Sequence, residues 1–529
     1  MANLIDRALA GVAPRLALRR VSARAKLKRY MEPGASSRFG WHSNGFEGAS
    51  RGRRTGNWLA RHQDANAVLR GALPILRARS RDLARNNPWA SSGVATLETF
   101  VVGRGIELQP EGTGRVADAA NALWRTWSHS TDCDSTGCDD LGGIQALAVR
   151  TIVESGSVLI RRRLRRTSDG LAVPLQLQVL EPDHLDLERT KGNGENRVIH
   201  GVEYDLVGRV AAYWLYPDHP GDDHPRARRT VSRRVPAEEV AHVFLKTRPG
   251  QVQGVPWLTS AMLRARNLDE FEDAELLRMA IASNWAGFVT TETDPEVDDV
   301  GPNDEKIEDV QPGAIEYLRP GESIEFPQLP KVDGRDSYVS WHLRAIAASL
   351  QVPYEALTGD LTKVNFSSGR MGFNAFERRV AVWQRRMMVN ALLRRVWGWF
   401  VEAAMASLQL PASAAELTTT WTPPSRTILD PEKDEEADKA AVRNGTKTLF
   451  EVLRSRGRDP RAHLEEASAA FEMLDELGLT LDLDPRRVAP AGAAATGGDE
   501  GAPDEDESGG DSDVGDDDAG DDSEPDADE

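Results

Sequence analysis

The sequence predicts a mainly helical α+β fold that is divided into several parts. Apolar residues recur at helical spacing in long runs, above all at residues 371–405, where no proline interrupts the pattern. Short runs rich in β-branched residues are concentrated between residues 157 and 245. A chain of 529 residues allows two to four domains, and a hydrophobic content of 40% is ordinary for a soluble protein.

Charge is distributed unevenly along the chain. The formal net charge is −18, but residues 491–529 hold 17 acidic residues and no Lys or Arg, whereas residues 1–85 hold 18 basic and 5 acidic residues. Basic and acidic ends predict different partners. No run of about 18 apolar residues occurs and the N-terminus lacks an apolar signal core, so we expect no membrane contact and synthesis in the cytoplasm.

The first half of the chain predicts a basic mobile arm at residues 1–60 and an α+β region at residues 61–250. Pro74 should kink the first helix of this region or open a second one. The expected helices are 65–86, 89–100, 114–128 and 144–154. The expected strands are 106–108, a hairpin of 158–160 with 175–179, and then 198–204, 210–215 and 240–245.

Several polar clusters in this region have two interpretations. The arginines between 161 and 166 could meet nucleic acid or an acidic neighbour, or could protect a solvated sheet edge. Glu181-Pro-Asp-His184 and Asp218-His-Pro-Gly-Asp-Asp-His224 contain metal-ligating residue types, but Asp and Pro at this density are typical of turns. Cys133 and Cys138 lack zinc-site spacing and predict free thiols. We therefore predict no metal and no cofactor.

A long helix is predicted from about residue 256 to 283. Its apolar contacts should come from Leu268, Phe271, Leu276 and either Met279 or Ala280. Its remaining surface is acidic and forms either a charged surface face or the wall of a channel that repels phosphates. The acidic residues concerned are Asp269, Glu270, Glu272, Asp273 and Glu275. A proline-rich α+β insertion follows at residues 290–337, and a second helix at 338–352.

Two helices are then joined by a polar segment at residues 358–370. It carries Lys363, Asn365, Ser367, Ser368 and Arg370, with no acidic residue among them. Ammonium, guanidinium and hydroxyl groups together suit contact with a phosphate backbone without base reading. A solvated loop whose Ser and Asn side chains cap the next helix is the alternative.

The last part of the chain predicts a helical region at residues 406–485 with one strand at 418–421. Asp430-Pro431 and Asp459-Pro460 each place an N-cap before a proline at the first helical position. Beyond this region, residues 486–529 form an acidic tail that is disordered by composition. No P-loop, Gly-x-Ser-x-Gly or His-Glu-x-x-His motif occurs, so we predict no enzyme.

Three ordered blocks resemble the lambda-type portal proteins of tailed phages. They are Arg79-Ser-Arg-Asp-Leu-Ala-Arg-Asn-Asn-Pro-Trp-Ala90, then Gly254-Val-Pro-Trp-Leu258 with Leu268-Asp-Glu-Phe-Glu-Asp-Ala-Glu-Leu276, and Val352-Pro-Tyr-Glu-x-Leu-x-Gly-Asp360 with Asn365-Phe-Ser-Ser-x-Arg370. The resemblance covers roughly residues 79–405. It implies long helices around a central channel, with a wing (61–250), stem helices (256–289 and 338–357), a clip (290–337), a tunnel loop (358–370), a long wing and crown helix (371–405) and a crown (406–485).

The resemblance also implies a function. We expect a ring of twelve copies at one capsid vertex of the virion, assembled in the bacterial host cytoplasm, through which double-stranded DNA passes without sequence preference during packaging and ejection. The implied partners are the large terminase subunit, the major capsid or scaffold protein and a head–tail adaptor. The tunnel-loop residues would contact DNA, and the acidic helix would line the channel. A DNA-binding head-completion or adaptor protein and a head-maturation enzyme are the alternatives.

Overall fold

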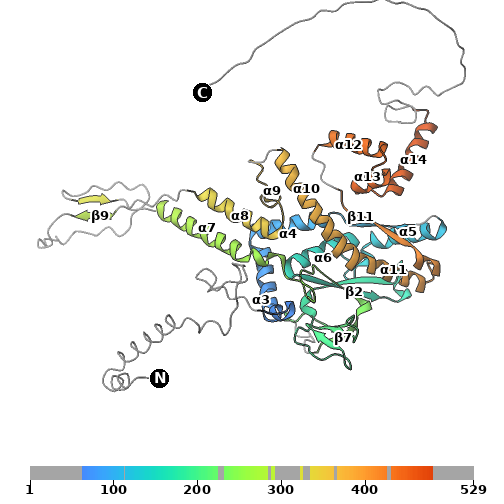
Figure 1. The fold of residues 1–529 in the computed structure, drawn as a ribbon, viewed down its shortest axis with the longest axis horizontal. Helices are drawn as coiled ribbons and strands as arrows, with labels where there is room; N and C mark the ends of the chain where they lie inside the picture. Colours follow the sequence, from blue (N-terminus) through green and yellow to red (C-terminus); the bar gives the residue numbers. More distant parts are fainter. Residues whose placement is uncertain are drawn as a thin grey trace, which may run out of the picture.

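The computed structural model describes residues 62–111, 114–223, 231–283, 288–291, 322–325, 334–362, 366–425 and 430–479. For residues 281–283, 288–291, 322–325 and 366–368 it describes the backbone alone. Within these residues the protein is mainly helical with four small sheets (Figure 1). No helix in these ranges has both the length and the apolar character needed to cross a membrane.

The described part begins with two consecutive helices, α3 (Ala65–Asn86) and α4 (Pro88–Val101). The Asp64 side chain accepts from Ala67 N and caps α3. Helix α3 continues through Pro74 instead of opening a second helix there, because the buried side chains of Leu69, Leu73 and Arg77 hold both sides of the proline against the core. Asn87 then caps α4 directly before a proline at its first position.

Two antiparallel sheets follow, and the predicted hairpin of 158–160 with 175–179 is confirmed as β2 with β3. The first sheet has the order β3-β2-β8 and the second the order β4-β5-β6-β7. The expected strand 198–204 is two strands, since His200 and Gly201 adopt positive φ and turn the chain back. The bounds are β2 Ser157–Leu164, β3 Leu175–Leu180, β4 Arg197–Ile199, β5 Val202–Tyr204, β6 Val210–Leu215, β7 Arg233–Pro236 and β8 Val240–Phe244.

The main core lies where the helices of the first half of the chain meet the long helix of residues 366–406. Helix α6 (Leu141–Ser155) contributes Ile144 and Ile152, which are fully buried. An aromatic cluster joins α5 (Arg115–Ser128) to α11 (Arg394–Ala406): Trp124 lies 5.3 Å from Trp397 and 5.0 Å from Phe400 between ring centroids. Such pairs add stabilisation beyond the buried area, so residues about 275 positions apart are fixed together.

A helical hairpin projects from this core (Figure 1). Its first helix, α7 (Met262–Ser283), begins later than the expected residue 256, because residues 257–260 form a separate 3-10 turn. Its second helix is α8 (Arg335–Leu350), and β9 (Phe288–Thr291) pairs with β10 (Glu322–Glu325) between the two. Most of the predicted insertion at 290–337 lies outside the described residues.

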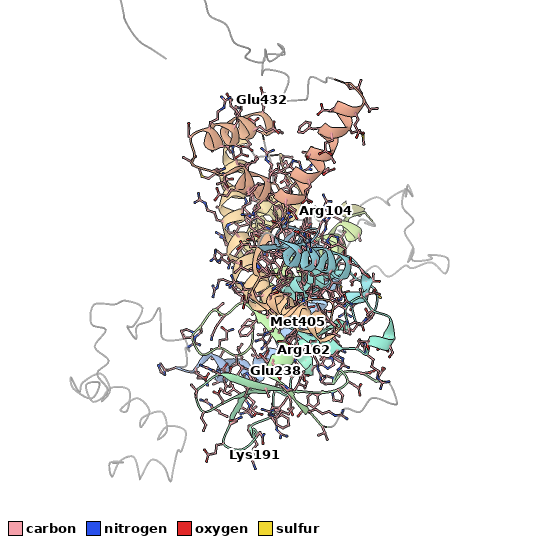
Figure 2. All side chains as sticks on the ribbon, turned by 90° about the vertical axis from the view of Figure 1, so that its right-hand side faces the viewer. Arg104, Arg162, Lys191, Glu238, Met405 and Glu432 are labelled. Carbon is pink, nitrogen blue, oxygen red and sulfur yellow. The ribbon has the colours of Figure 1, made fainter. Side chains whose placement is uncertain are left out.

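The expected long helix at 371–405 runs on without a break, but its hydrogen-bonding pattern changes from α-helical to π-helical and back. It consists of α10 (Phe366–Trp383), a π-helical segment (Gln384–Leu393) and α11. Strand β11 (Thr418–Thr422) then pairs with β1 (Glu107–Glu111), a long-range pairing that the sequence did not predict. Three helices end the described chain: α12 (Pro431–Arg443), α13 (Leu449–Ser455) and α14 (Pro460–Glu476). Figure 2 shows them around Glu432, at the opposite end from Lys191 in the sheet region.

Candidate nucleic-acid interface

The predicted polar loop at 358–370 is shorter in the structure. It follows α9 (Tyr354–Thr358), and α10 already begins at Phe366. Asp360 holds the start of the loop by accepting hydrogen bonds from the backbone N of Thr362 at 3.0 Å and from its hydroxyl at 2.6 Å. Lys363 and Asn365 lie outside the described residues. Ser367 and Ser368 occupy the first turn of α10, where only the backbone is described.

Arg370 is one helical turn into α10 and already has a partner. Its Nη2 lies 2.7 Å from Asp434 Oδ1, and the two side chains are 37% and 29% exposed. Asp434 lies in the first turn of α12. The ion pair therefore fastens the start of α10 to the C-terminal helices, and Arg370 must leave this pair if it is to contact a phosphate.

The acidic residues of α7 divide into two groups. Asp269 accepts a hydrogen bond from Asn87 Nδ2 at 2.7 Å, and Glu270 pairs with Arg266 at 2.9 Å. Glu272 and Asp273 are exposed. Partial desolvation raises the pKa of Asp269 and of Glu272, and the repulsion among these carboxylates adds to the effect. The carboxyl groups of α7 therefore lie close enough together that the charge on one disfavours the ionisation of the next.

Glu275 and two apolar residues differ from their predicted positions. Glu275 is 5% exposed and pairs with Arg278 at 2.9 Å, so it lies in the interior of the protomer and does not face a channel in this conformation. Leu276 and Met279, which were expected to supply apolar contacts, are 65% and 42% exposed in the protomer. Leu268 is fully buried. Within the protomer, the C-terminal half of α7 therefore buries Glu275 and exposes these two apolar side chains.

The helical hairpin packs through aromatic contacts. Phe271 lies 4.5 Å from Tyr338, and the guanidinium of Arg264 lies 5.5 Å from the ring of Trp341, which makes the two helices antiparallel. Large apolar side chains nevertheless remain exposed on both helices, among them Leu263, Leu276, Leu277 and Trp341. Single exposed apolar residues are normal, but a group on one hairpin indicates a surface that another chain covers.

The arginines of the β2–β3 hairpin mostly have partners inside the protein. Arg161 pairs with Glu239 at 3.3 Å, and Arg162 pairs with Glu402 at 2.6 Å. Arg165 donates to Gln176 at 2.7 Å. The cluster therefore stabilises the sheet and its contact with α11, which leaves less positive charge for a nucleic acid than the sequence suggested.

The two metal-like sequence segments meet in the structure. Ligand atoms of Glu181, Asp183 and His219 lie within 4.8 Å of one another. The guanidinium of Arg81 contacts both carboxylates, at 3.3 Å from Glu181. Burial alone would raise the pKa of Asp183, but Arg77 and Arg81 outweigh it and hold the pKa below its usual value. Arginine already supplies the positive charge that a metal ion would bring, so we assign no metal here.

Comparisons with known proteins agree with the resemblance seen in the sequence. A family model described as "Phage portal protein, lambda family" matches residues 51–384. The probable portal protein of Halomonas phage phiHAP-1 is 29% identical over 462 residues, which cover 82% of this chain and 87% of the relative. Portal protein B of Escherichia phage lambda is 21% identical over 375 residues, which cover 63% and 69%.

Solved structures show weaker similarity. The neck of a native gene transfer agent particle, computed with C12 symmetry, contains a chain with a TM-score of 0.40 and 15% identity, covering 72% of this chain and 94% of that one. The crystal structure of a HK97 family phage portal protein from Corynebacterium diphtheriae has a TM-score of 0.31 and 12% identity, covering 68% and 98%.

Proposed function

Since the chain belongs to the lambda family of phage portal proteins, we propose that it forms a ring at one capsid vertex and serves as the conduit for double-stranded DNA during packaging and ejection. Portal proteins are structural components of the virion and not enzymes. The specific roles proposed below are ring formation, DNA contact and partner docking.

Ring formation is supported mainly by the exposed apolar surface of the α7–α8 hairpin. Leu263 and Leu277 on α7 and Trp341 on α8 are 72%, 63% and 63% exposed. Burying one such side chain contributes about 1.5–3 kcal/mol, and a ring repeats the contact at every subunit boundary. A head-to-tail interface that closes on itself leaves none of these surfaces exposed to water.

The size of the purified protein tests this role. Twelve chains of 58.1 kDa form a particle of roughly 0.7 MDa, which mass photometry separates from a monomer or dimer. Leu277→Glu should convert the ring to small species, because a carboxylate placed in the interface loses its water. Leu206→Glu is the matched control, since Leu206 is 78% exposed in a turn far along the chain from the hairpin. A small wild-type species, or a ring that survives Leu277→Glu unchanged, contradicts the proposal.

DNA contact is proposed for the tunnel loop, with Lys363, Asn365, Ser367, Ser368 and Arg370 touching the phosphate backbone. Cations and hydroxyls suit phosphate oxygens, and weak contacts multiplied around a ring can hold a duplex. Glu272 and Asp273 are the acidic residues of α7 best placed to line the channel, because they are exposed, and Asp269 and Glu270 flank them. Repulsion from these carboxylates lets DNA slide without adhering.

The ion pair of Arg370 gives this proposal a sharp test. Lys363→Ala combined with Arg370→Ala should spare ring assembly but lower the DNA content of assembled particles. Asp434→Asn breaks the same ion pair while leaving the cation in place, so it should preserve DNA content. Equal loss in both proteins would mean that Arg370 acts only as a clamp between α10 and α12, and normal DNA content in the double variant would refute the contact.

Partner docking is proposed for the clip, residues 290–337, which is mostly outside the described residues. Strands β9 and β10 lie at the far end of the α7–α8 hairpin (Figure 1). An insertion carried there can meet the large terminase subunit first and a head–tail adaptor later. We propose that the wing and the basic arm at residues 1–60 contact the capsid or scaffold protein.

A further inference from the structure

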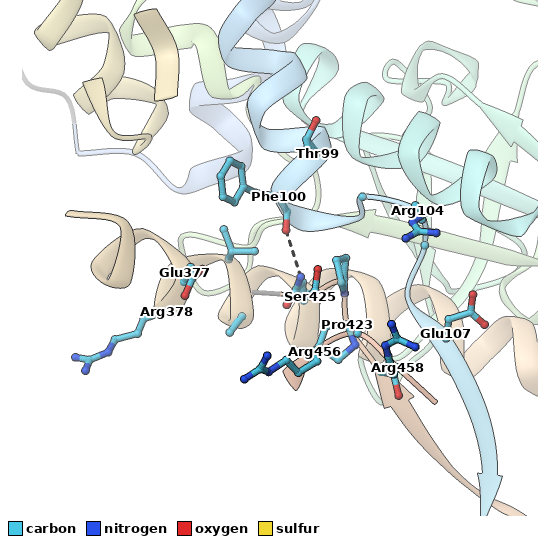
Figure 3. Close-up of a pocket in the computed structure, with 18 of the residues that line it drawn as sticks. Thr99, Phe100, Arg104, Glu107, Glu377, Arg378, Pro423, Ser425, Arg456 and Arg458 are labelled. Carbon is cyan, nitrogen blue, oxygen red and sulfur yellow. Dashed lines mark hydrogen bonds between the residues drawn. The ribbon is translucent and has the colours of Figure 1, made fainter. Parts of the chain in front are cut away.

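A polar cleft lies where the wing meets the C-terminal helices (Figure 3). Its volume is about 1180 Å³. The walls come from the end of α4, the middle of α10, the segment after β11 and the loop between α13 and α14. Gly457 fixes that loop against Ser425, because a Cβ added at Gly457 would lie 2.7 Å from the backbone N of Ser425. The cleft is therefore formed by elements that are far apart in the sequence.

Positive charge dominates the walls of the cleft. Arg104, Arg378 and Arg458 are exposed, and none of them forms an ion pair within the described ranges. A fourth arginine, Arg456, is paired with Asp438 at 3.1 Å and with Glu435 at 3.4 Å. Two carboxylates, Glu107 and Glu377, also line the cleft. Because Arg456 is already paired, the other three arginines exceed these carboxylates by one positive charge. Arg458 also contacts Nδ1 of His463 at 3.5 Å. Figure 3 shows Arg456 and Arg458 near Arg104 and Glu107, whereas the side chain of Arg378 extends away from them. Guanidinium groups with no ion-pair partner among the described residues suit a flexible chain of carboxylates.

The chain itself carries such a segment. Described structure ends at Leu479, three residues beyond α14, and the first acidic residue of the tail is Asp499. Helix α14 has 17 residues and is about 25 Å long. The 19 residues between Leu479 and Asp499 are rich in Ala, Gly and Pro, and a flexible linker of this length spans about 25 Å on average. That span is long enough to bring the acidic run back along α14 to Arg458, which lies two residues before the start of this helix.

We propose that the acidic run 499–529 docks into this cleft, with its carboxylates on Arg104, Arg378 and Arg458. The tail bridges the wing and the C-terminal helices and neutralises the cleft. Tethering gives it a local concentration in the millimolar range, which makes weak ion pairs sufficient. Duplex DNA is a competing polyanion, but its stiffness favours open surfaces over a recess between helices. Docking within one chain does not require ring formation, so this inference and the proposed function can fail separately.

Photocrosslinking in the full-length protein tests the docking. A photoreactive residue in place of Ser512 should crosslink to peptides that line the cleft, such as residues 99–107 and 422–425, when probed in 0.1 M NaCl. The Arg104→Gln/Arg378→Gln/Arg458→Gln protein should lose this crosslink by roughly eightfold, since each exposed ion pair contributes a factor of about two. Arg85→Gln/Arg125→Gln/Arg209→Gln removes the same charge from exposed arginines outside the cleft and should leave the crosslink unchanged.

Three outcomes overturn the proposal. Crosslinks spread evenly over the protein surface mean that the tail has no docking site. A cleft crosslink that persists in the triple cleft variant means that the arginines do not hold the tail. A cleft crosslink abolished by one equivalent of short duplex DNA in the same buffer assigns the cleft to nucleic acid instead. Unchanged urea midpoints for both triple variants confirm that the comparison concerns folded protein.

Discussion

Arg77 carries a buried charge in α3. Its replacement by methionine has two opposing effects on the free energy of unfolding. Its side chain is fully buried in α3. Its Nε donates to the carbonyl of Ser155 at 3.1 Å, and its Nη2 donates to Gln253 Oε1 at 3.1 Å. These bonds join α3 to the end of α6 and to the segment that leads into α7.

The two effects can be estimated separately. Hydrogen bonds to a charged group contribute about 1.5–3 kcal/mol each, so Arg77→Met loses roughly 3–6 kcal/mol from two of them. Burial lowers the pKa of Arg77 from 12.5 to about 10, which corresponds to about 3 kcal/mol against the charged form. Methionine does not carry this cost. The net expected loss in the free energy of unfolding is therefore about 1.5 kcal/mol, the middle of a range of roughly 0–3 kcal/mol.

Urea unfolding at pH 7.5, followed by tryptophan fluorescence, measures this loss. Arg77→Ala should lose about 2–3 kcal/mol more than Arg77→Met, since it also leaves a cavity. Arg79→Met, two residues away on the same helix and exposed, should change stability by less than about 0.5 kcal/mol. An Arg77→Met protein more stable than the wild type would show that desolvation outweighs both hydrogen bonds.

Two further predictions concern the same region. His242 is half-buried, and desolvation lowers its pKa to about 3, so as pH falls below 6.5 the unfolded chain binds a proton and the folded chain does not. Between pH 7 and pH 5 the wild type should lose about 2 kcal/mol more stability than His242→Leu; parallel pH profiles would contradict this. Gly254→Ala would place a Cβ 1.8 Å from the carbonyl oxygen of Gly156, so we expect a loss above about 3 kcal/mol or insoluble protein. Gly71→Ala, with nothing within 4 Å of the added Cβ, should instead gain about 0.5–1 kcal/mol, and equal thermal midpoints for the two proteins would refute the steric argument.

The sequence was informative wherever the signal was local. Asp430-Pro431 and Asp459-Pro460 predicted the starts of α12 and α14, because an N-cap and a proline at the first position act within one turn. The β2–β3 hairpin was predicted from two apolar runs. The motif at Gly254 carried the family resemblance, and the structure supplies its physical reason, which is the close approach to Gly156.

Only the tertiary structure shows which charged side chains already have a partner within the protein and which are exposed. The partners of Arg370 and Arg162 are 64 and 240 residues away in sequence, and no periodic pattern connects them. Glu275 is interior while Leu276 is exposed, because the packing of α7 against α8 and the core sets which side of the helix faces inward, and charge pattern does not. Helix starts, strands and family membership follow from short-range chemistry, whereas ion pairs, buried charges and the arginine-lined cleft depend on which distant segments the fold brings together.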